Sequence, residues 1–114
     1  MELEKFVKLA ETLEKKKKGK KEEEELEKLQ KLFERFHLLN RNYLDKEAFE
    51  KARDSIPSIA EAIAGTVRYL DAEVTRLRSK RMKLPFENME LAEMQKVQTR
   101  NEMLLKELLS QFPE

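Results

Sequence analysis

The strongest constraint on the fold is a run of apolar residues between positions 60 and 77 that repeats every seven residues. The spacing alternates between three and four residues, at Ala60, Ile63, Val67, Leu70, Val74 and Leu77. This coiled-coil pattern places all six along one side of an α-helix, which must bury that side against another element. The sequence therefore predicts an all-α protein in which a long helix, from about Ser58 to Met82, packs along an antiparallel neighbour.

The length and composition are those of one domain, residues 1–114, without covalent cross-links. A chain of 114 residues can bury one hydrophobic core, and the absence of cysteine excludes disulfides and thiolate metal sites. There is no apolar run long enough to span a membrane and no secretory leader, so we expect a cytoplasmic protein without a membrane partner. The abundance of lysine and glutamate is typical of proteins from hyperthermophiles and of idealised helical designs.

The N-terminal part, residues 1–40, is expected to form a helical hairpin. Its first helix extends from Glu2 through the lysines that precede Gly19, and Gly19 is the residue expected to end it. Alternatively, a single helix runs through Gly19, at a cost of roughly 1 kcal/mol relative to alanine. The second helix begins near Glu22, where acidic residues complement the N-terminal helix dipole, and it ends near Leu39.

Residues 45–112 are expected to form a short helix followed by a long C-terminal helical hairpin. Asp45 is expected to cap the short helix. The residues that this helix turns inward are expected to be Ala48, Phe49 and Ala52. Ser58 and Glu61 have capping-box spacing and are expected to begin the long helix, whereas Asn88 is expected to cap the last one. The expected fold is an antiparallel helical bundle of four long helices and one short helix.

The last helix has more apolar residues than a single buried stripe requires. Five of them are expected to form the surface that binds a protein partner or a second copy of the chain: Leu104, Leu105, Leu108, Leu109 and Phe112. Alternatively, the last helix lies at the centre of the bundle and packs against two neighbours. The first interpretation makes the protein a non-enzymatic interaction module: an adaptor, a small chaperone-like protein or a subunit of a larger assembly.

A basic cluster at the end of the heptad helix supports an alternative function. Five cations occur within eight residues that contain no anion: Arg76, Arg78, Lys80, Arg81 and Lys83. With help from Arg100, they would bind the phosphates of a nucleic acid. The competing interpretation is a solvated helix end, since cations complement the dipole there. A net charge of +1 also argues against a chain that coats nucleic acid with its whole surface.

Asn101 is a polar residue in the middle of the apolar stripe of the last helix. A buried asparagine lowers stability but fixes the register or the oligomeric state of packed helices. Asn101 is therefore predicted either to specify how the last helix pairs or to lie at the rim of the stripe.

Catalytic and metal-binding patterns are weak. Glu34 and His37 have the spacing found in di-iron helical bundles, but such a site needs two of these motifs, and the chain has one histidine. A histidine in the last turn of a helix is the simpler interpretation. The sequence also has no glycine-rich phosphate loop and little from which to build a catalytic triad, so we expect no enzyme, metal or cofactor.

Overall fold

The computed structural model describes residues 2–15, 19–82 and 84–111. These residues form five α-helices and no strand: α1 (Glu2–Lys15), α2 (Gly19–Leu39), α3 (Lys46–Ala52), α4 (Ile56–Ser79) and α5 (Pro85–Gln111). The prediction of an all-α bundle with four longer helices and one short helix is confirmed.

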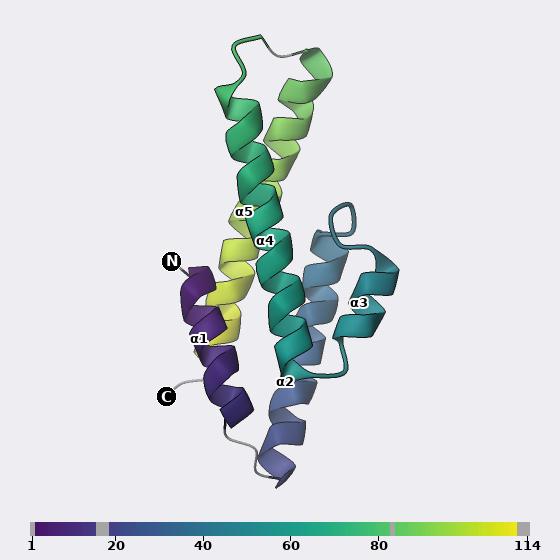
Figure 1. Ribbon diagram of the computed structural model, residues 1–114, viewed down its shortest axis with the longest axis vertical. Helices are drawn as coiled ribbons and strands as arrows, with labels where there is room; N and C mark the ends of the chain where they lie inside the picture. Colours follow the sequence, from purple (N-terminus) through teal and green to yellow (C-terminus); the bar gives the residue numbers. More distant parts are fainter. Residues whose placement is uncertain (1, 16–18, 83, 112–114) are drawn as a thin grey trace.

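The framework of the molecule is a long antiparallel hairpin of α4 and α5 (Figure 1). Both α1 and α2 pack against α4 and α5, and α3 packs against α4. These three helices cover only part of the hairpin, which extends beyond them at the end where α4 turns into α5. The molecule is therefore elongated and measures 55 × 28 × 17 Å.

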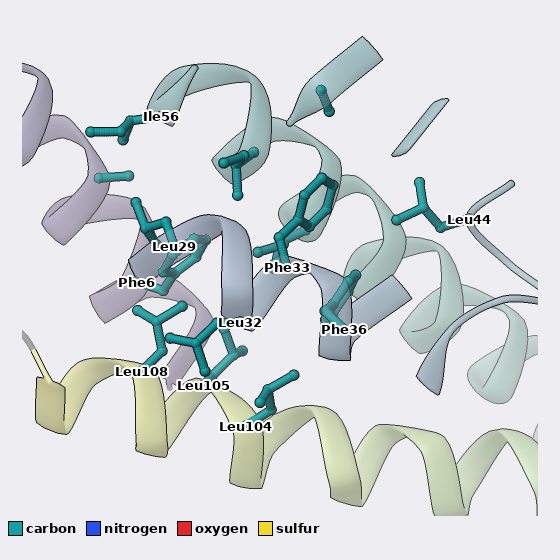
Figure 2. Packing of buried hydrophobic residues seen from close by; sticks show 14 of the residues in the cluster. Phe6, Leu29, Leu32, Phe33, Phe36, Leu44, Ile56, Leu104, Leu105 and Leu108 are labelled. Carbon is teal, nitrogen blue, oxygen red and sulfur yellow. The ribbon is translucent and has the colours of Figure 1, made fainter. Parts of the chain in front are cut away.

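The core consists of two clusters along this hairpin. All five helices contribute to the larger cluster, whose members labelled in Figure 2 are Phe6, Leu29, Leu32, Phe33, Phe36, Leu44, Ile56, Leu104, Leu105 and Leu108. The smaller cluster lies between α4 and α5 and contains Leu70, Val74, Leu77, Met94 and Val97. The heptad of α4 is buried or half-buried throughout, so the predicted packing of its apolar side is confirmed.

The short helix α3 begins as predicted. The Asp45 carboxylate accepts a hydrogen bond from the backbone N–H of Ala48 at 2.7 Å, which satisfies a donor that has no partner within the helix. Phe49 and Ala52 are buried, but Ala48 is exposed, contrary to expectation. A seven-residue helix resting on α4 has one buried side, and Ala48 points away from it.

The start of α4 lies earlier than predicted. Its N-cap is Ser55 and not Ser58: the Ser55 hydroxyl accepts a hydrogen bond from the backbone N–H of Ser58 at 3.3 Å. Pro57 therefore lies in the first turn instead of separating two helices. Proline is tolerated there because the first N–H groups of a helix have no intrahelical partner.

Two other helix starts differ from prediction. Gly19 is the first residue of α2, which was expected to begin near Glu22, and α5 begins at Pro85, before the expected cap Asn88. Pro85 is tolerated for the same reason as Pro57, because the first N–H groups of a helix need no intrahelical acceptor.

Candidate functional site

The leucine surface predicted on the last helix is mostly core. Leu104, Leu105 and Leu108 belong to the larger cluster, and Leu105 is 2% exposed. Leu109 is half-buried, and Phe112 lies outside the described residues. This corrects the expected docking surface: α5 is the central helix that the alternative interpretation described, in contact with α1, α2 and α4.

The predicted basic cluster separates into paired and unpaired cations. Arg76 forms an ion pair with Glu73, with 2.9 Å between nitrogen and oxygen, and Lys80 forms one with Glu87 at 2.5 Å. Each of these cations is already neutralised by its own hairpin, which reduces its attraction for an external anion.

Arg78 and Arg81 differ from their paired neighbours. Both are exposed, and neither has an ion-pair partner among the described residues. Lys83, the last cation of the predicted cluster, lies outside the described residues. The unpaired charge of this part of the chain therefore lies at the very end of the α4–α5 hairpin.

Arg100 does not join this cluster. It lies 15 residues beyond the start of α5, about 22 Å along the helix axis at 1.5 Å per residue. There it lines a groove of about 290 Å³ together with Arg35, Met103 and Glu107. The nucleic-acid surface predicted from the sequence is thus divided between two distant places.

Glu87 closes the turn between α4 and α5. One carboxylate oxygen accepts a hydrogen bond from Lys80 Nζ at 2.5 Å, and the other accepts one from the backbone N–H of Leu84 at 3.2 Å. These hydrogen bonds lower the pKa of Glu87, so the buried carboxylate is charged at neutral pH. Since Leu84 immediately precedes α5, Glu87 has the role of the acidic residue in a capping box. Glu87 thereby ties the end of α4 to the start of α5.

Large apolar side chains are exposed around this closed turn. Four of the seven that are exposed in the described part of the chain fall within residues 82–89: Met82 (90% exposed), Leu84 (55%), Phe86 (62%) and Met89 (75%). Phe86 and Met89 are three residues apart, so they lie on the same side of the first turns of α5. We call the set Arg78, Arg81, Met82, Leu84, Phe86 and Met89 the tip surface.

The sequence analysis missed the apolar part of the tip surface. Its signal was available: Met82, Leu84 and Phe86 lie close to Pro85 and outside the apolar stripes of both helices. Residues outside the stripes do not pack the two helices together, so a cluster of apolar ones marks a candidate binding surface.

The polar residue predicted within the stripe of the last helix is buried and paired inside the chain. Asn101 is 2% exposed and exchanges two amide hydrogen bonds with Asn40, of 2.8 and 3.0 Å. Asn40 also donates to the carbonyl oxygen of Phe36 at 2.8 Å. Asn101 therefore lies inside the stripe and not at its rim, and it links α5 to the end of α2.

Glu34 and His37, which have the spacing of a metal-binding motif, contact other side chains in the structure. The His37 ring stacks on Phe49, with 4.4 Å between ring centroids, and Glu34 lies 3.7 Å from the Arg53 guanidinium. Within residues 2–15, 19–82 and 84–111, no group of three or more metal-binding side chains occurs.

Of the helices described, none combines the length and the apolar character that crossing a membrane requires. Comparisons with protein-family models, with curated proteins and with solved structures found no match.

Proposed function

We propose that this chain is a non-enzymatic helical interaction module that docks on a protein partner through the tip surface. The observation that carries the proposal is the concentration of four exposed apolar side chains at the end of the α4–α5 hairpin. The free energy falls when a partner removes exposed apolar groups from water, and the flexible methionine side chain adapts its shape to different partners. The end of the hairpin, where α4 turns into α5, also extends past the other helices (Figure 1).

A protein partner accounts for the tip surface better than a nucleic acid does. Three of its four apolar side chains are not aromatic and offer no ring on which a base can stack. Arg76 and Lys80 are engaged in ion pairs, and Arg100 is remote, so Arg78 and Arg81 are the described cations of the predicted patch that remain free to contact phosphates there.

A different partner accounts for the tip better than a second copy of the chain. Two copies meeting tip to tip would bring Arg78 and Arg81 of one close to the same arginines of the other. Like charges that face each other across an interface oppose association. We therefore propose that the partner at the tip is a different protein and not a second copy of this chain.

A library of random peptides displayed on phage, panned against the immobilised protein, tests this proposal. We expect enriched peptides that bind the wild-type chain and lose at least about tenfold in affinity for the variant M82S/F86S/M89S, because apolar anchors dominate most interfaces. All three side chains are exposed, so the variant should retain the helical circular dichroism of the wild type.

The matched control is L38S/M103S, which removes two apolar side chains of similar exposure, 69% and 65%, away from the tip. This control should bind the enriched peptides as the wild type does. Peptides that bind M82S/F86S/M89S undiminished, or a library that yields no enriched peptide, would overturn the proposal.

A further inference from the structure

We infer that the partner segment recognised by the tip surface is an acidic amphipathic helix. The inference rests on the proposed function and adds the chemistry of the partner. Its basis is the combination of unpaired positive charge with a small apolar area at one end of the hairpin.

The tip surface contains two arginines and no carboxylate, and the two carboxylates that pair with cations nearby do so with other residues. Glu73 forms an ion pair with Arg76. Glu87 forms one with Lys80 and also accepts a hydrogen bond from the backbone N–H of Leu84. Glu90 and Glu93 lie near Tyr43, whose pKa burial raises most and these two carboxylates raise further. Among the described residues no carboxylate forms an ion pair with Arg78 or Arg81, so acidic side chains of a partner complement these two arginines.

The size of the apolar area fits a single helix. At about 200 Å² for each large apolar side chain, the exposed fractions of Met82, Leu84, Phe86 and Met89 amount to roughly 560 Å². An interface of standard size buries about 800 Å² on each side, of which roughly 450 Å² is apolar, so the tip offers enough apolar area for a complete binding site. A helix fills such a site with one apolar stripe, whose anchors are spaced three and four residues apart.

The positions of the apolar residues along the chain are compatible with this mode of binding. Phe86 and Met89 are three residues apart at the start of α5, and Met82 and Leu84 lie in the connection that precedes it. A partner helix would lay its apolar stripe on these four side chains. Acidic residues on the flanks of that stripe would then reach Arg78 and Arg81, whose long side chains extend from the end of α4 and from the turn.

Two labelled peptides of about 18 residues, or five helical turns, test the inference. They share one leucine stripe and carry either glutamate or lysine at all flanking positions. In fluorescence anisotropy titrations, we expect the glutamate peptide to bind the wild-type chain at least about tenfold more tightly than the lysine peptide, and less tightly as salt rises from about 50 to 200 mM.

The decisive variant is R78E/R81E, which should reverse the preference so that the lysine peptide binds more tightly. The matched control, R41E/R100E, changes the charge by the same amount at two exposed arginines outside the tip surface. It should leave the preference for glutamate unchanged, because charges separated by more than a Debye length are screened.

The other outcomes separate this inference from the proposed function. If both peptides bind equally and both are lost in M82S/F86S/M89S, the inference falls and docking at the tip stands. The inference of an acidic helix is also wrong, while docking at the tip stands, if neither designed peptide binds and panning yields non-acidic peptides that fail to bind M82S/F86S/M89S. Tighter binding of a DNA duplex, or of phosphatidylserine vesicles, that is lost in R78E/R81E would overturn both proposals.

Discussion

At the scale of single residues, Asn40 and Asn101 show how a polar pair selects one arrangement of packed helices. Their amides are buried and satisfied by three hydrogen bonds, and no buried side-chain nitrogen or oxygen of the described residues lacks a partner. Each hydrogen bond contributes about 1 kcal/mol net, whereas a buried amide without a partner costs about 1–3 kcal/mol. Sliding α2 along α5 by one turn, about 5.4 Å, would separate the amides. The pair therefore penalises incorrect registers more than it stabilises the correct one.

The penalty can be measured with a double-mutant cycle. We expect N40L and N101L each to lower the free energy of unfolding by about 1–3 kcal/mol, because each leaves one buried amide without its partner. The double variant N40L/N101L should return to within about 1 kcal/mol of the wild type, since no unpaired amide remains. Urea unfolding followed by circular dichroism measures all four proteins. Additive losses in the double variant would contradict this role of the pair.

At the scale of elements, the helix starts depend on which N–H groups need a partner. Ser55 and Pro57 together begin α4, and Pro85 and Glu87 begin α5 in a similar way. The sequence analysis placed the cap of α4 three residues too late, at Ser58, and the cap of α5 four residues too late, at Asn88, in each case after a proline. The first turn tolerates proline, so the cap lies before it and not after it.

The position of the α4 cap can be tested by removing the hydroxyl of Ser55 and that of Ser58 in separate variants. We expect S55A to lower the free energy of unfolding by about 1 kcal/mol, because the N–H of Ser58 then loses its acceptor. The matched variant S58A keeps this cap and removes only the hydrogen bond of 2.8 Å that the Ser55 hydroxyl donates to the Ser58 hydroxyl, so it should cost less than S55A, which loses both hydrogen bonds. Chemical denaturation of both variants measures the difference. An equal loss, or a larger one in S58A, would show that Ser55 does not cap the helix.

At the scale of the whole molecule, the shape follows from the unequal lengths of the helices, since α4 and α5 are longer than the three helices that pack against them. The smaller core cluster holds α4 and α5 together toward the projecting end of the hairpin, and Leu39 at the end of α2 and Tyr43 pack beside it. The radius of gyration is 15.4 Å, whereas a compact chain of this length has one of about 13 Å. The tip surface is thus carried on a projecting element that a partner can reach without displacing the rest of the bundle.

Small-angle scattering tests this shape in solution. We expect a radius of gyration near 15.4 Å and a longest dimension near 55 Å, both independent of protein concentration. A value near that of a compact chain would contradict the projecting hairpin. A radius of gyration that grows with concentration would indicate self-association and would count against a different protein as the partner at the tip.

Much of the secondary structure was predictable because it depends on neighbouring residues along the chain. The heptad of α4, the Asp45 cap and the end of α2 at Leu39 are all consequences of local periodicity or local hydrogen bonding. The candidate site was predictable only in part. Its cations appeared as a cluster, but their division into paired Arg76 and Lys80 and unpaired Arg78 and Arg81 depends on contacts that sequence spacing alone does not establish.

The sequence by itself determined that this chain is an all-α bundle, because apolar residues spaced by three and four can bury one side only as helices. Tertiary structure decided which apolar residues remain in contact with water. Leu105 and Leu108 are covered by the other helices, whereas Phe86 and Met89 stay exposed on the projecting end of the hairpin. It also decided that Asn101 pairs with Asn40, 61 residues away. Burial and long-range pairing depend on where distant segments end in space, and periodicity along one helix does not specify this.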